Sequence, residues 1–74
     1  MTLSELKVGE RGRVLEVGGE KVLRHRLLDM GITPRTIIQI KKIAPMGDPI
    51  ELLLRGYVLS VRLEDADQIT IEEV

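Results

Sequence analysis

The fold is decided by one stretch of the chain, Ile50-Glu51-Leu52-Leu53-Leu54-Arg55-Gly56-Tyr57-Val58-Leu59-Ser60-Val61-Arg62-Leu63. In it an apolar side chain recurs at every second position, first in residues 50–54 and then in residues 57–63. This period is typical of half-buried antiparallel strands, in which successive side chains point to opposite faces. Because Arg55-Gly56 stands between the two runs, the stretch predicts a hairpin with a tight turn.

Outward from this hairpin, three more short apolar runs are bounded by turn residues and indicate further strands. The five predicted strands are Arg11–Val17, Thr36–Ile43, Ile50–Arg55, Tyr57–Leu63 and Gln68–Glu72. The cluster Ala44-Pro45-Met46-Gly47-Asp48-Pro49 predicts a second hairpin turn. Glu64-Asp65-Ala66-Asp67 is too short for a helix and predicts a single 3₁₀ turn.

Only the segment from Glu20 to Met30 has a helical period. Leu23, Leu27 and Met30 follow one another at i, i+4 and i+7, which places them on one helix face. Gly31 then predicts a left-handed helix end in which Ile32 contacts Leu27, as in a Schellman cap. Pro34 comes next and cannot continue a helix.

The hydrophobic core must be aliphatic, because the 74 residues include eleven Leu, eight Ile and seven Val but only one Tyr and no Phe or Trp. So short a chain has marginal stability, and without Cys it has no disulfides to add to it. Closing the sheet on itself would hide its edges. We therefore predict a mainly β fold: a small five-stranded antiparallel barrel with one short α-helix at about residues 20–30, forming a single domain over residues 1–74.

Few residues offer catalytic chemistry. His25 is the only histidine, and neither Ser4 nor Ser60 lies in the sequence context of an activated nucleophile. The glycines form no phosphate-binding motif. One tyrosine cannot supply the stacked aromatic rings with which small barrels hold single-stranded nucleic acid or proline-rich peptides. The sequence indicates a protein that is not an enzyme and does not bind nucleic acid.

Two surfaces remain as candidates for protein contacts. Residues 1–42 carry a net charge of +4 and residues 43–74 carry −5, which sums to the −1 of the chain. The helix contributes a basic ridge, and the second hairpin turn contributes a loop stiffened by two prolines. Both surfaces also have ordinary interpretations, as a solvated helix face and as a rigid turn. The candidate partner-binding residues are Lys21, Arg24 and His25 on the ridge and Pro45, Met46 and Asp48 in the loop.

A divalent metal ion is the other ligand to consider. His25 and Asp29 are four residues apart, so an imidazole and a carboxylate would share one helix face. They are the candidate ligands for Fe²⁺ or Zn²⁺, although such pairs are common in helices that bind no metal. No other cofactor is expected.

The chain has neither a signal-peptide pattern nor a run of about 18 apolar residues, so we expect a cytoplasmic protein that reaches a membrane only through a partner. Nothing in the sequence indicates an oligomeric state.

Three ordered motifs resemble one known family. They are Leu23-Arg24-His25-Arg26-Leu27-Leu28-Asp29-Met30-Gly31-Ile32-Thr33-Pro34, Ala44-Pro45-Met46-Gly47-Asp48-Pro49-Ile50-Glu51 and Arg55-Gly56-Tyr57-Val58-Leu59-Ser60-Val61-Arg62. Together with Leu6-Lys7-Val8-Gly9 and Gly12 they make essentially the whole chain resemble the FeoA family.

The resemblance implies an SH3-like barrel and a non-enzymatic accessory role in bacterial ferrous iron uptake, with the cytosolic part of the transporter FeoB as partner. The alternative is a metal-binding sensor domain, like the SH3-like domain of iron-dependent repressors. Arg35 departs from the family, which often has Gly there, so the turn either holds Arg35 in a strained conformation or adopts another type. Asp29 and Arg55 are expected to form either an internal ion pair or a partner contact.

Overall fold

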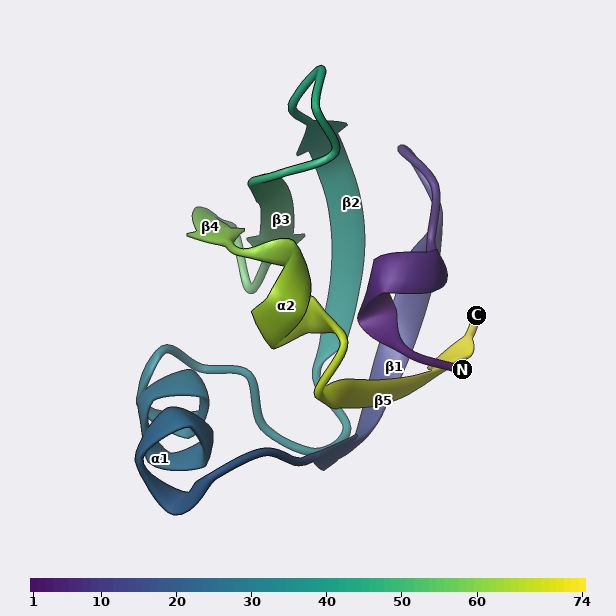
Figure 1. Cartoon of the computed structure of the whole chain (residues 1–74). Coiled ribbons are helices and arrows are strands. Elements are labelled where there is room, and N and C mark those ends of the chain that lie inside the picture. Colours follow the sequence, from purple (N-terminus) through teal and green to yellow (C-terminus); the bar gives the residue numbers. More distant parts are fainter.

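One antiparallel sheet of five strands forms the body of the molecule, seen here in a computed structural model that describes residues 1–74 (Figure 1). A helix of nine residues follows the first strand, and two shorter helical turns lie near the N-terminus and before the last strand. In chain order the elements are η1 (Leu3–Glu5), β1 (Arg11–Val17), α1 (Lys21–Asp29), β2 (Ile37–Ile43), β3 (Ile50–Leu54), β4 (Tyr57–Val61), α2 (Leu63–Ala66) and β5 (Ile69–Glu73).

The mainly β fold is confirmed, but the sheet does not close into a barrel through hydrogen bonds. The strand order is β4-β3-β2-β1-β5, so β4 and β5 are edge strands. The N-terminal segment covers the edge of β5: Thr2 bridges to Thr70, and the Ile71 N–H donates to the Met1 carbonyl over 2.8 Å. In a closed barrel the two edge strands, β4 and β5, would pair with each other. Here helix α2 connects β4 to β5 in the chain (Figure 1).

The prediction of a 3₁₀ turn before the last strand is wrong, because Leu63–Ala66 form the short α-helix α2. The Ala66 N–H donates to the Arg62 carbonyl over 3.0 Å, which is the α-helical spacing. The Leu63 N–H at the start of α2 has a partner outside the helix, since it donates to Asp48 Oδ1 over 3.0 Å. Because α2 already begins at Leu63, β4 ends at Val61 and does not extend to Leu63 as predicted.

The core is aliphatic, as predicted, and lies on the concave side of the sheet. Two breaks in the strand register, between Val14 and Glu16 and between Ile40 and Lys42, allow the sheet to curve around it. Fifteen buried apolar residues form one cluster: Leu3, Leu6, Val14, Val17, Leu27, Ile32, Ile38, Ile40, Ile50, Leu52, Leu54, Val61, Ala66, Ile69 and Ile71.

Helix α1 ends in the predicted Schellman cap. Gly31 has a φ of +97°, its N–H donates to the Leu28 carbonyl over 3.0 Å, and the Ile32 N–H donates to the Leu27 carbonyl over 3.1 Å. Leu27 and Ile32 are both fully buried. The cap therefore fixes α1 to the core at its C-terminal end, while Lys21 at its other end is exposed.

Candidate functional site

The basic ridge of α1 is only partly free to meet a partner. The side chains of Lys21 and His25 are exposed and make no hydrogen bond or ion pair within the chain. Arg24 is exposed too, but its Nε donates to the Val17 carbonyl over 3.1 Å, which joins the helix to the end of β1. Arg26 pairs with Asp65 of α2 over 3.2 Å. Lys21 and His25 are therefore the ridge residues whose polar groups remain unused.

The loop between β2 and β3 presents the second set of predicted residues. Met46 at its tip is 92% exposed, and Pro45 beside it is exposed as well. Asp48 has a structural contact, because its carboxylate accepts the Leu63 N–H at the start of α2. The Asp48–Pro49 peptide bond is cis.

The structure does not bring the two predicted surfaces together. Figure 1 shows the β2–β3 loop at one end of the molecule and α1 at the other. The molecule measures 29 × 24 × 23 Å, so a partner that touched both surfaces would have to extend along its whole length. The ridge and the loop are thus two separate candidate contacts.

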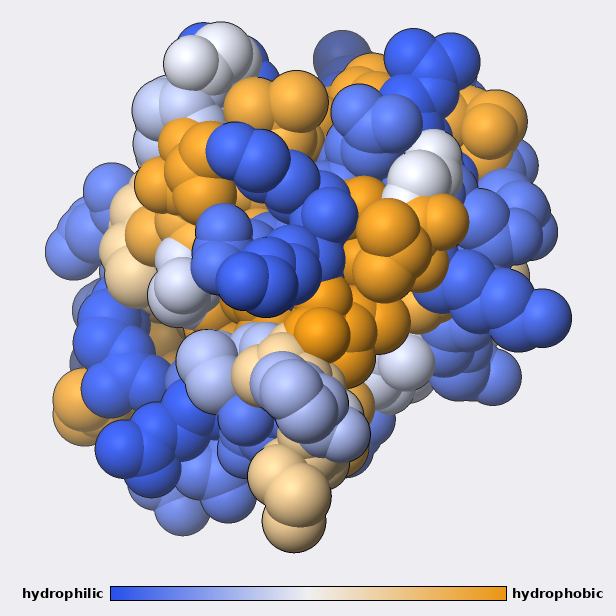
Figure 2. Space-filling model, turned by 90° about the horizontal axis from the view of Figure 1, so that it is seen from above, coloured by the Kyte–Doolittle hydropathy of each residue, from blue (hydrophilic) through white to orange (hydrophobic).

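Figure 2 shows the face seen from above, where apolar side chains reach the surface in several places and hydrophilic ones lie between them.

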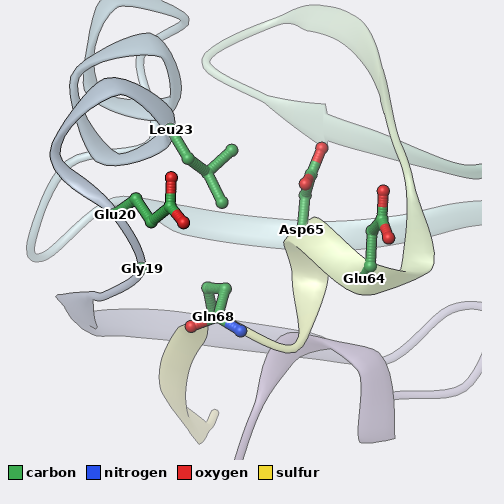
Figure 3. A pocket seen from close by; sticks show the side chains of 6 residues that line it. All are labelled: Gly19, Glu20, Leu23, Glu64, Asp65 and Gln68. Carbon is green, nitrogen blue, oxygen red and sulfur yellow. The ribbon is translucent and has the colours of Figure 1, made fainter.

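A shallow pocket of about 380 Å³ opens between α1 and α2 (Figure 3). Three carboxylates line it, from Glu20 on one side and from Glu64 and Asp65 on the other, and Leu23 is its one apolar residue. Because Asp65 is the ion-pair partner of Arg26, one of these carboxylates is already neutralised within the chain. This acidic pocket was not among the sequence predictions, since its residues are distant in sequence and meet only through the packing of the two helices.

The predicted metal ligands gain no third ligand. His25 and Asp29 are both exposed on α1, and the chain holds no group of three or more His, Cys, Asp or Glu side chains that could hold a metal ion. Tight zinc or iron sites need several converging ligands. The structure therefore offers this pair no coordination shell.

A set of hydrogen bonds joins the β3–β4 hairpin to the end of α1 and to the turn that follows it, and these bonds were not predicted from the sequence. The Arg55 guanidinium donates to the hydroxyls of Thr33 over 3.1 Å and Thr36 over 3.0 Å. The Tyr57 hydroxyl donates to the Met30 carbonyl over 2.5 Å. We call these bonds the hairpin anchor. Arg55 was expected to form either an internal ion pair or a partner contact. Within the chain it forms no ion pair and holds the two segments together through two neutral hydroxyls.

Two arginines take left-handed backbone conformations in the turns around the anchor. Arg55 has a φ of +47° and Gly56 a φ of +82°, which is the type I′ geometry that suits a two-residue hairpin turn. Arg35 has a φ of +77°, so the turn after Pro34 keeps the conformation that favours Gly although Arg stands there. Of the two alternatives for this turn, the strained one is found.

No helix of the chain is both long and apolar enough to cross a membrane.

Comparison with known proteins identifies the family. The FeoA domain model matches residues 1–73. The Fe(2+) transport protein A/Fe(2+) transporter FeoB fusion protein of Porphyromonas gingivalis is 38% identical over 72 residues. That match covers 97% of this chain but only 8% of the fusion protein. The solution structure of the FeoA protein from Chlorobium tepidum is 39% identical, with a TM-score of 0.93 over 100% of this chain and 70% of that one.

More distant structures share the fold alone. Stenotrophomonas maltophilia FeoA, solved in complex with zinc and described as a prokaryotic SH3 domain protein, has a TM-score of 0.85 at 21% identity, over 97% of this chain and 89% of that one. A manganese-dependent transcriptional repressor has a TM-score of 0.92 at 13% identity, over 100% of this chain and 36% of that one. The SH3-like fold predicted from the resemblance is confirmed. The match of the family model over almost the whole chain shows that this chain belongs to the FeoA domain family.

Proposed function

We propose that this chain is a non-enzymatic accessory protein of ferrous iron uptake that binds the cytosolic part of a FeoB-type transporter. The observation that carries the proposal is the Porphyromonas gingivalis relative, in which a segment 38% identical to this chain is joined to FeoB in one polypeptide. Joining two domains in one chain raises their effective concentration for each other, so it favours pairs that must associate.

The residues that line the pockets favour a docking role over catalysis. The two pockets, of about 380 and 490 Å³, are lined mainly by polar and charged residues, with Leu23 in the first and Pro49 and Leu63 in the second as the apolar ones. Pockets for small-molecule substrates are usually lined mainly by apolar side chains with a few polar groups. Neither pocket contains the histidine of the chain.

The ridge and the loop are the surfaces proposed for this contact. On the ridge, Lys21 and His25 are the informative positions, because Arg24 also supports the structure. In the loop the informative position is Met46, whose side chain is almost fully exposed. Metal binding is not part of the proposal, since His25 and Asp29 have no third ligand.

The test is calorimetric binding of the purified cytosolic region of the transporter to this protein and to two variants. We expect Lys21→Ala/His25→Ala and Met46→Ser each to weaken binding, by about tenfold if that surface is central to the contact. Lys41→Ala/Lys42→Ala is the control, because it removes exposed charges from β2. If the unaltered protein did not bind the region at all, the proposed function would be wrong. If only the control weakened binding, the ridge and loop would be the wrong surfaces.

A further inference from the structure

The outer edge of β4 is the side of the sheet that no other part of the chain covers. At the opposite side, the N-terminal segment pairs with β5 through Thr2 and Met1. Strand β4 pairs with β3 alone, although the Tyr57 side chain at its start reaches the end of α1. Figure 1 shows β4 at the margin of the sheet, on the side of β3 away from β2.

The strand register identifies the backbone groups that point outward. Leu54 and Tyr57 close the two-residue turn and are partners in the ladder, so they form a hydrogen-bonded pair. Hydrogen-bonded pairs alternate along an antiparallel ladder. Leu59 therefore points its N–H and carbonyl toward β3, whereas Val58 and Ser60 point theirs away from it. None of the backbone hydrogen bonds outside the helices and strand ladders involves Val58 or Ser60.

This edge lacks the features that usually prevent pairing with another chain. Edge strands are commonly protected by a charged residue, a proline or a bulge. The five residues of β4 are uncharged and contain no proline, and their register with β3 is continuous. Tyr57 is 41% exposed and Val58 is 45% exposed, so apolar area is available beside the free backbone groups.

The charges around β4 indicate what kind of strand fits. Arg55 and Arg62 stand just outside its two ends. Arg55 bonds only to neutral hydroxyls, and Arg62 has a 3.9 Å contact with Glu64 in which both side chains are about three-quarters exposed. Both cations are therefore open to carboxylates from a partner.

A second copy of the chain fits this edge less well. If two β4 strands paired antiparallel about Leu59, Val58 of each would meet Ser60 of the other, and all the outward groups would be satisfied. The same register would place Arg62 of each copy next to Arg55 of the other, which brings like charges together at both ends. Arg62 would lie opposite Gly56 of the other copy and so one residue from its Arg55, close enough for the like charges to repel each other.

We propose that β4 is a strand-addition site, on which an extended segment of the partner with carboxylates near its two ends pairs with the backbone of Val58 and Ser60. The proposal rests on the proposed function for the identity of the partner, which is the cytosolic region of the transporter. Backbone pairing supplies the affinity in this mode, and the alternate side chains and end charges supply specificity.

The edge is tested first with a synthetic peptide, DTVTVTVE, which carries carboxylates at its ends and β-branched residues between them. At saturating peptide, amide exchange at Val58 and Ser60 should slow about tenfold or more. Exchange at Leu59, whose amide points toward β3, should stay unchanged. A peptide with lysine at both ends should bind about tenfold more weakly. An extended peptide has two edges, one that pairs with β4 and one that faces solvent. Methylating the amides along the pairing edge should abolish binding, and methylating those along the solvent edge should not.

Unchanged exchange at Val58 and Ser60, or equal effects of methylation on the two edges, would overturn the strand-addition site. If these amides were already protected without peptide and the protein sedimented as a dimer, the occupant would be a second copy and the proposal would also be wrong.

The partner is tested separately, by competition between the peptide and the cytosolic region of the transporter. Displacement of the region by the peptide is the expected result. A region that binds but is not displaced would contradict the proposed use of β4 and leave the proposed function standing. A region that does not bind at all would contradict the proposed function, and the exchange experiment would still decide whether β4 accepts a strand.

Discussion

Replacing Gly31 by Ala tests the junction between α1 and the hairpin anchor. Gly31 has a φ of +97°, and a Cβ at this position would overlap the Tyr57 hydroxyl. A left-handed conformation costs a residue with a Cβ about 1–2 kcal/mol. Displacing the hydroxyl would also break its hydrogen bond to the Met30 carbonyl, which contributes about 1 kcal/mol.

Gly31→Ala should therefore lower the free energy of unfolding by about 2–3 kcal/mol, the sum of these two costs. For a domain of this size, each kcal/mol shifts the melting temperature by about 4–8 °C. We expect a melting temperature lower by about 10–20 °C, measured by circular dichroism and checked by urea unfolding.

Two further variants separate the two costs. Gly47 has a φ of +85° and no atom within 4 Å of the Cβ position, so Gly47→Ala should show the backbone cost alone. In a Tyr57→Phe background the overlapping hydroxyl is gone, and Gly31→Ala should then cost about 1–2 kcal/mol. If Gly31→Ala cost the same in both backgrounds and no more than Gly47→Ala, the contact between Gly31 and Tyr57 would not exist in solution.

Three other predictions concern single contacts. Arg35→Gly should raise the free energy of unfolding by about 0.5–1 kcal/mol in urea titrations, because Arg35 has a φ of +77°, and Arg35→Ala should give no such gain. Asp48→Ala should lower the free energy of unfolding by about 1 kcal/mol, because the Leu63 N–H at the start of α2 loses its acceptor. Asp48→Asn should recover most of this loss, since its side-chain oxygen can still accept the bond. A hydrogen bond and charge repulsion from Glu10 raise the pKa of Glu73 above its usual value. Protonation of Glu73 therefore favours the folded state, and this contribution is lost as the pH rises through the raised pKa. Melting temperatures measured across the acidic range should show a weaker decline with rising pH in Glu73→Gln than in the unaltered protein.

Most of the secondary structure could be predicted because it depends on local patterns. The strand Arg11–Val17 has the predicted bounds, and the helix differs from the prediction by one residue at each end. The Schellman cap at Gly31 was predictable as well, since it needs only a left-handed residue and one apolar contact.

Features that depend on distant contacts could not be predicted in this way. Helix α2 begins where Asp48, fifteen residues earlier in the chain, accepts the Leu63 N–H. The open sheet likewise depends on how the N-terminal segment lies along β5, which no period of apolar residues encodes.

The candidate site was predicted less completely than the fold. The sequence pointed to Lys21 and His25 because charge on a helix face can be seen in the helical period. It could not show that Arg24 bonds to the end of β1, nor that Arg55 and Tyr57 join the hairpin to α1. The free edge of β4 was also invisible, because the predicted barrel would have covered it.

The position of the only aromatic residue has a practical consequence. Tyr57 begins β4, bonds to the end of α1 and is the only aromatic residue among the 74 residues. Its fluorescence therefore reports on one point of the molecule, without the tryptophan emission that obscures tyrosine in most proteins. Loss of the bond to Met30 or the arrival of a strand along β4 would change the surroundings of this single fluorophore. The unmodified protein thus carries its own spectroscopic probe, placed where the helix meets the sheet.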